Sequence, residues 1–185
     1  MTVWWTAFLA FMSTNIDDIL LLMLLFSQTR TFFDRARIVL GQYLGIAALF
    51  AFSVFGSLGT RFLPEGAVGI LGLVPIALGV ACFFQKEEED EQIRGTGVLP
   101  TAFLALANGA DNIGIYIPVF SGFGVSDFLV TALVFAVMTG LWCFFGYHIG
   151  AFPPIQRILR RYRRVIVPTV FILLGTWILI QHIFF

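Results

Sequence analysis

Six long apolar runs constrain this chain more than any other feature of its sequence. A run of roughly 20 apolar residues is long enough to cross a bilayer as a helix. The six runs together take about 126 of the 185 residues, and they occupy residues 3–26, 38–58, 67–84, 99–119, 128–149 and 165–184. The connections leave no room for a separate folded domain. The sequence therefore predicts an all-α integral membrane protein, a single domain over residues 1–185 with six transmembrane helices.

The composition agrees with a membrane protein and excludes other classes. Apolar residues make up 59% of the chain and charged residues 12%, whereas soluble domains average about 45–50% and about 25%. The formal net charge is zero, so the chain has no overall field to attract nucleic acid. We therefore expect the lipid bilayer, and no nucleic acid, as its surroundings.

The basic residues orient the predicted helices. Ten of the eleven Lys and Arg residues lie in the loops 27–37, 85–98 and 150–164, and Arg61 is the single one on the opposite side. Basic loops stay in the cytosol. The count predicts three cytoplasmic loops, both termini outside, and a multi-pass protein of the plasma membrane.

Three acids lie deep inside the apolar runs, and they are Asp17, Asp18 and Asp111. An Asp at the bilayer centre costs roughly 2.5–3.5 kcal/mol on insertion scales. The runs contain no Lys or Arg that could pair with them. Water, protons or a bound cation must therefore compensate these carboxylates.

A short repeat links the two acidic regions. The sequence Thr-Ala-Phe-Leu-Ala at 6–10 recurs at 101–105, and the offset of 94 residues that relates the acids places Asp17 on Asp111. Two halves of three helices each have opposite orientations in the membrane, because three is odd. Such inverted repeats, with a site between them, are typical of transporters. The predicted parts are repeat one at about 1–84, an acidic cytoplasmic linker at about 85–98, and repeat two at about 99–185.

The polar residues of the two motifs can gather around a cation. Residues three or four apart share a helix face, which brings Asn15 beside Asp18, and Asn108 beside Asp111 and Asn112. Packed face to face, the two helices would supply carboxylate and amide oxygens, which suit a divalent metal ion such as manganese, magnesium or calcium. The candidate metal ligands are Asn15, Asp17, Asp18, Asn108, Asp111 and Asn112. Further candidates are Thr14, Gln42 and Tyr116.

Both polar motifs also resemble helix starts. Thr14-x-x-Asp17 and Asn108-x-x-Asp111 have the spacing of an N-cap residue followed by an acid at the third helical position. We therefore expect both helices to be interrupted there, freeing backbone carbonyls for an ion. The alternative interpretation is that these polar residues join helices through hydrogen bonds.

Other residues have plainer interpretations. Cys143 lies inside the fifth run and is interpreted as a small core residue, although a thiol is also a metal ligand. His148 lies near the end of the same run and is interpreted as an interfacial residue, with proton relay as the alternative. Gly41-x-x-x-Gly45 and Gly146-x-x-x-Gly150 allow helices to approach closely, and we expect them to pack within one chain.

Three motifs resemble those of the cadmium-resistance transporter (CadD) family, within the lysine-exporter superfamily of small six-helix exporters. They are Asn15-x-Asp17-Asp18, Gly-Gln-Tyr-Leu-Gly at 41–45 and Gly-Ala-Asp-Asn-Ile-Gly at 109–114. The resemblance covers essentially the whole chain. It implies export of cadmium and related divalent metals from the cytosol. The family position before the last motif varies and can be a thiol, whereas here it is Asn108.

The sequence predicts a secondary transporter and not an enzyme. The nucleotide-binding pattern Gly-x-x-x-x-Gly-Lys-Ser/Thr is absent, so an ion gradient must drive export. We expect antiport of a divalent metal (cadmium, with zinc or manganese as further cargoes) against protons or sodium. The metal is then substrate, and no cofactor is expected. One alternative is an intramembrane aspartyl hydrolase that pairs Asp17 or Asp18 with Asp111, and another is an exporter of a small solute such as an amino acid. A homo-oligomer is left open.

Overall fold

The structure is a computed structural model that describes residues 2–60, 97–109 and 111–149, with scattered residues between 73 and 80 and between 169 and 180. Apart from these scattered residues, the spans predicted at 67–84 and 165–184 lie outside the described residues. The basic loop 150–164 also lies outside them, as does the acidic linker except for its last two residues.

The longer described stretches form six helices. They are α1 (Val3–Thr14), α2 (Ile16–Ser27), α3 (Phe32–Gly59), α6 (Val98–Asn108), α7 (Asn112–Phe120) and α8 (Val125–Ile149). This arrangement confirms an all-α fold for the described part of the chain.

Two of these helices, α3 with 28 residues and α8 with 25, are long and apolar enough to cross a membrane alone. The helix α3 begins six residues before the apolar run that predicted it. The cause is a capping box, in which the Thr31 side chain accepts from the Asp34 backbone N–H and the Asp34 carboxylate accepts from the Thr31 N–H. Such a box satisfies two N–H groups that the helix start would otherwise leave unpaired.

The two spans that carry the acidic motifs are both broken, as the sequence predicted. The axes of α1 and α2 meet at 56°, and those of α6 and α7 meet at 71°. Each bent pair passes as one apolar span, so the described residues contain up to four candidate membrane spans. The breaks fall at Asn15 and just after Asn108, where the polar residues lie.

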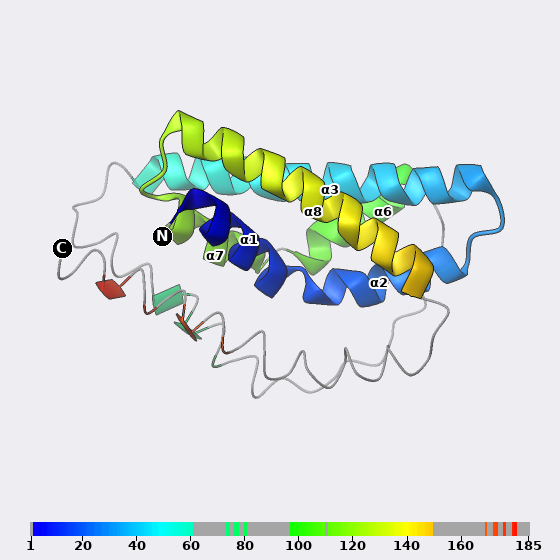
Figure 1. Ribbon diagram of the computed structural model, residues 1–185, viewed down its shortest axis with the longest axis horizontal. Coiled ribbons are helices and arrows are strands. Elements are labelled where there is room, and N and C mark those ends of the chain that lie inside the picture. Colours follow the sequence, from blue (N-terminus) through cyan, green and yellow to red (C-terminus); the bar gives the residue numbers. More distant parts are fainter. Residues whose placement is uncertain are drawn as a thin grey trace.

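The described helices of the two halves correspond. At the offset of 94, α1 and α6 end at equivalent residues, Thr14 and Asn108, and each bent pair is followed by one long helix. The helix α3 packs mainly against α6 and α7, and α8 packs mainly against α1 and α2. In Figure 1 the pair α1–α2 runs from left to right and the pair α6–α7 from right to left. Six spans, the inverted repeat and the sidedness of the termini stay predictions.

Glycines bring the helices of opposite halves into close contact. A Cβ added at Gly41 would lie 2.6 Å from the carbonyl oxygen of Val98, and one added at Gly45 would lie 2.5 Å from the Ala105 Cβ. Both positions face α6, which confirms that this Gly-x-x-x-Gly motif packs within the chain. Gly146 plays the same part between α8 and α2, where an added Cβ would lie 2.7 Å from the Leu22 Cβ; Gly150 lies outside the described residues.

Phe135 of α8 lies at the centre of the core. Its ring contacts one ring of α1, one of α3 and two of α7, namely Phe11, Phe50, Tyr116 and Phe120. Because lipid tails are as apolar as these side chains, such contacts stabilise the bundle through close packing.

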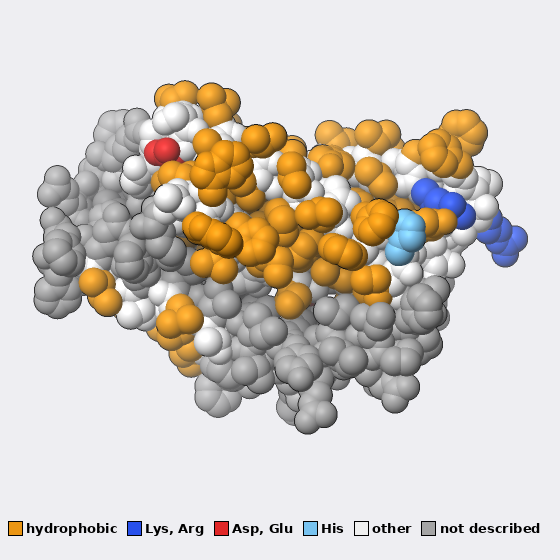
Figure 2. Space-filling model, in the orientation of Figure 1, with side chains coloured by type: hydrophobic (Ala, Val, Ile, Leu, Met, Phe, Trp, Pro, Cys, Tyr) orange, Lys and Arg blue, Asp and Glu red, His pale blue; other side chains and the backbone are white. Residues whose placement is uncertain are grey.

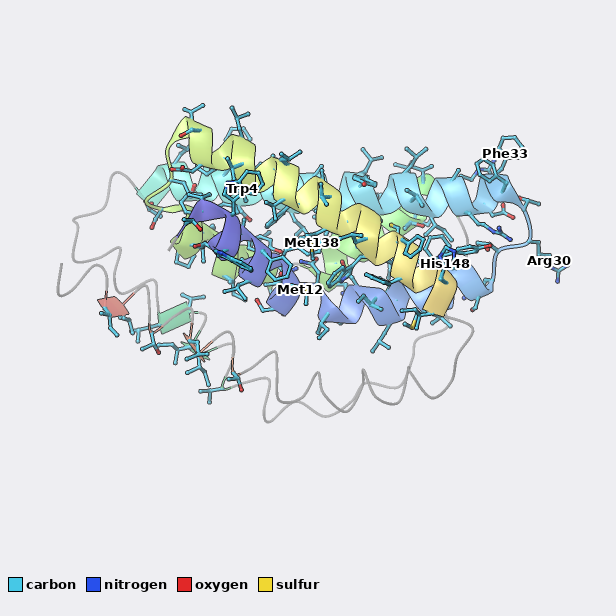
Figure 3. All side chains as sticks on the ribbon, in the orientation of Figure 1. Trp4, Met12, Arg30, Phe33, Met138 and His148 are labelled. Carbon is cyan, nitrogen blue, oxygen red and sulfur yellow. The ribbon has the colours of Figure 1, made fainter. Side chains whose placement is uncertain are left out.

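The outer surface is apolar. Large side chains that follow one another along α8 are exposed, and they include Leu129, Leu133, Val137, Leu141 and Phe144. Figure 2 shows apolar side chains over the middle of this face and basic side chains at one end. In Figure 3, Arg30 and His148 lie toward the end of the molecule opposite Trp4. A row of exposed large apolar side chains along one helix suits contact with lipid.

Candidate cation site at the helix breaks

Asn15 forms the first break. Its backbone leaves the helical conformation (φ −110°, ψ 19°) and separates α1 from α2. Its side-chain amide donates back to the Phe11 carbonyl at 3.0 Å, and its own carbonyl accepts from the indole N–H of Trp142. The side chain is completely buried. Trp142 of α8 therefore holds the break in place from outside the broken span.

The N-cap roles expected for Thr14 and Asn108 are wrong. Both residues end a helix, and the residues at the N-cap positions of α2 and α7 are Asn15 and Asp111, neither of which makes a side-chain capping bond. Thr14 instead donates its hydroxyl back to the Ala10 carbonyl at 2.8 Å. The Thr14 oxygen accepts from the Asn15 side-chain amide at 2.7 Å and not from a backbone N–H of α2.

Asp18 is the most enclosed acid of the site. It lies in the first turn of α2 and is 2% exposed. One carboxylate oxygen accepts from the Asn108 side-chain amide at 2.6 Å, and the other accepts from the Gln42 amide at 2.7 Å. Gln42 belongs to the first half and Asn108 to the second, so Asp18 joins the two halves.

These contacts explain how Asp18 is tolerated at this depth. A hydrogen bond to a charged group contributes about 1.5–3 kcal/mol, and the start of a helix stabilises a carboxylate by about 0.3–1 kcal/mol. Two such bonds and the start of α2 are comparable with the roughly 2.5–3.5 kcal/mol that an Asp costs at the bilayer centre. Neutral amides therefore supply part of the stabilisation of the Asp18 carboxylate that we expected from water, protons or a cation.

Tyr116 makes the second connection between the halves. Its hydroxyl is hydrogen-bonded to the Thr14 hydroxyl, and it accepts from the Asn15 amide at 2.8 Å. The ring is 1% exposed and stacks on Phe120. The sequence-predicted residues Thr14, Asn15 and Tyr116 are therefore in one cluster.

The other predicted ligands have different surroundings. Asn112 is buried, Asp17 is half-buried and Asp111 is exposed. The carboxylates of Asp17 and Asp111 both interact electrostatically with Asp18. Within the described ranges, however, no group of three or more His, Cys, Asp or Glu side chains is placed to hold a metal ion. The ligand roles of these residues stay predictions.

Two buried carbonyl oxygens in this region have no hydrogen-bond partner among the described residues. They are Oδ1 of Asn15 and Oε1 of Gln42, whose side chains are 0% and 1% exposed. A buried acceptor without a donor costs about 1–3 kcal/mol. Oxygens of this kind are suited to a cation.

Cys143 lies close enough to Asp18 for the two side chains to interact electrostatically, whereas His148 lies at the surface. Cys143 is a free thiol, 5% exposed, within the apolar core. His148 is exposed, where its ring packs on Phe144 and one ring nitrogen lies 2.9 Å from the Phe144 carbonyl oxygen. These positions agree with a core cysteine and an interfacial histidine.

Comparison with known proteins gives one match. The sequence model of a family described as cadmium resistance transporters matches residues 11–184. No curated protein matches significantly, and no solved structure does. The match covers both broken spans and nearly the whole chain. The chain therefore belongs to the cadmium resistance transporter family.

Proposed function

We propose that the chain is a secondary transporter that exports a divalent metal ion from the cytosol across the plasma membrane. Its cargo is cadmium, with zinc or manganese as further cargoes. Family membership supports metal transport. The observation that carries the proposal is the buried carboxylate of Asp18, which lies between the breaks and is bonded by amides from both halves.

The geometry also supports movement of the two halves against each other. A site shared by repeats near the bilayer midplane is exposed to alternate sides when one repeat rocks against the other. The bonds from Asp18 to Asn108 and from Tyr116 to Thr14 cross between the halves. We propose that protons or sodium entering from outside displace the metal and complete an antiport cycle.

The geometry does not favour an aspartyl hydrolase. Such an enzyme shares a proton between two carboxylates, whereas both oxygens of Asp18 accept from amides. An amino-acid exporter would need a cation or a helix start for the substrate carboxylate, and the start of α2 already carries two acids.

The test is metal export from cells that express Asp18→Asn. This change keeps the shape of the side chain and removes its charge, so we expect loss of export of cadmium, zinc and manganese. Asp127→Asn is the matched control, because Asp127 lies in the first turn of α8 and its carboxylate accepts from the Gly124 backbone N–H outside the site. Export by Asp18→Asn at the wild-type rate would refute the proposal.

Coupling is tested separately in vesicles that contain the purified chain. An imposed pH gradient should drive metal flux, and metal flux should shift the internal pH. Flux that follows a sodium gradient and ignores pH would assign the antiport to sodium.

A further inference from the structure

The amides of Gln42 and Asn108 present their N–H groups to Asp18, and this orientation opposes cation binding. Both donors point positive hydrogen atoms at the carboxylate oxygens, at 2.7 and 2.6 Å. A cation that approached these oxygens would meet the same hydrogens. Metal ions in proteins are bound by the oxygen of an amide and not by its N–H group.

Close packing of α3 on α6 holds the backbones of the two residues as long as the halves keep this arrangement, so the side chains supply the adjustment to a bound ion. Gly41, next to Gln42, packs against the Val98 carbonyl and Thr101 of α6, and Gly45 packs against Ala105, three residues before Asn108. These contacts leave no space for α3 and α6 to slide toward each other. The terminal torsion of Asn and Gln is broad and roughly two-fold, so each amide can turn without moving a helix.

We infer that Gln42 and Asn108 are exchangeable ligands, whose amides turn when a divalent cation binds Asp18 and then face the ion through their oxygens. The turn converts two N–H donors into two oxygen ligands. The buried Oε1 of Gln42 has no hydrogen-bond partner among the described residues and is available to an ion, and the same holds for Oδ1 of Asn15. The inference rests on the proposed function, because it requires that Asp18 binds the transported ion.

The exchange would also select the substrate. The turned amides and the carboxylate supply oxygen atoms, which favour divalent ions that accept oxygen ligands. A monovalent cation gains less from each oxygen, and is less able to offset the loss of two hydrogen bonds to Asp18. The ligand class is therefore a divalent cation that loses part of its water shell on binding.

The test measures binding of Mn²⁺ and of Cd²⁺ to the purified full-length protein in detergent by calorimetry. Gln42→Met and Asn108→Leu keep the approximate size of each side chain and remove both the N–H group and the oxygen. If the oxygens are ligands, each variant lowers affinity at least tenfold, since even outer-shell changes cost about 10–100-fold. Ser57→Ala is the control, because the Ser57 hydroxyl bonds only to its own helix at Val54 and its loss leaves affinity unchanged.

An unchanged or higher metal affinity of the two variants would overturn the inference. If the N–H groups only compete with the metal, their removal frees Asp18, and Gln42→Met and Asn108→Leu bind metal as tightly as wild type or more tightly. Should either variant fail to fold, the smaller substitutions Gln42→Leu and Asn108→Ala also remove both the N–H group and the oxygen. We expect these variants to bind metal at least tenfold more weakly; unchanged or tighter binding overturns the inference.

Failure of the proposed function has a different signature. If the wild-type protein binds neither ion and Asp18→Asn exports metal normally, both the proposed function and the exchange of ligands are refuted. If the wild-type protein binds metal and Gln42→Met binds it equally tightly, only the exchange of ligands is refuted.

Discussion

Gly45→Ala should disrupt the site without changing any residue in it. Gly45 lies where α3 and α6 come closest, and its added Cβ would lie 2.5 Å from the Ala105 Cβ and 3.0 Å from the Ala102 carbonyl oxygen. An ordinary contact between carbon atoms is about 3.5–4.0 Å. The two helices must therefore separate by about 1 Å to accept one methyl group.

Separation of the two helices would affect Asp18, because its hydrogen-bond donor Asn108 is the last residue of α6. A shift of about 1 Å would stretch the 2.6 Å bond from Asn108 to Asp18 to about 3.6 Å, at which no hydrogen bond remains. Overpacking of a tight contact costs about 1–3 kcal/mol. For a chain of this size that cost corresponds to a fall in the unfolding temperature of about 2–12 °C.

The assay combines thermal unfolding of the purified variant with metal export by cells. Gly59→Ala is the matched control on the same helix, because an added Cβ there meets no atom within 4 Å. We expect Gly45→Ala to lose stability and export, and Gly59→Ala to keep both. Adding Ala105→Gly to Gly45→Ala should restore part of each loss. Equal behaviour of Gly45→Ala and Gly59→Ala would refute the close contact between α3 and α6.

Three further predictions concern the first break and the topology. Tyr116→Phe removes the hydroxyl that bonds Thr14 and Asn15, and should lower stability by about 1–3 kcal/mol; an unchanged unfolding temperature would contradict this. Trp142→Phe keeps an aromatic ring but leaves the Asn15 carbonyl without its donor, so a fall of similar size is expected, and no fall would show that the bond does not hold the break. A reporter fused to Phe185 that works only outside the cytosol should be active, whereas activity of a cytosol-only reporter there would reverse the predicted orientation.

The sequence predicted the broken spans because the signal is local. Polar residues and glycines interrupt the apolar runs around Asn15 and Asn108. In an otherwise apolar run these residues are the main features that can break a helix. The same local pattern gave the wrong capping roles. Thr14 bonds backward to its own turn, and its other partner is the hydroxyl of Tyr116, 102 residues away, which a local pattern cannot indicate.

Contacts over long distances in the sequence were harder to predict. Gln42 was a candidate ligand, but no local pattern indicated that it would donate to Asp18, 24 residues away. The hydrogen bond from Trp142 to Asn15 was not predicted, because a Trp in an apolar run gives the same sequence pattern whether it faces lipid or a buried carbonyl. A rule that buried indole N–H groups find an acceptor would have raised the question without naming Asn15.

The cross-packing of α3 on α6 and of α8 on α1 has a consequence for biogenesis. When the ribosome has delivered the first half to the membrane, the glycine face of α3 has not yet met its partner, because α6 is still to be made. The helices α1, α2 and α3 therefore remain incompletely packed in the bilayer until α6 inserts beside Gly41 and Gly45 and α8 then packs on α1 and α2. A chain truncated after α3 would leave the glycine face of α3 in contact with lipid, and we expect such a chain to be degraded.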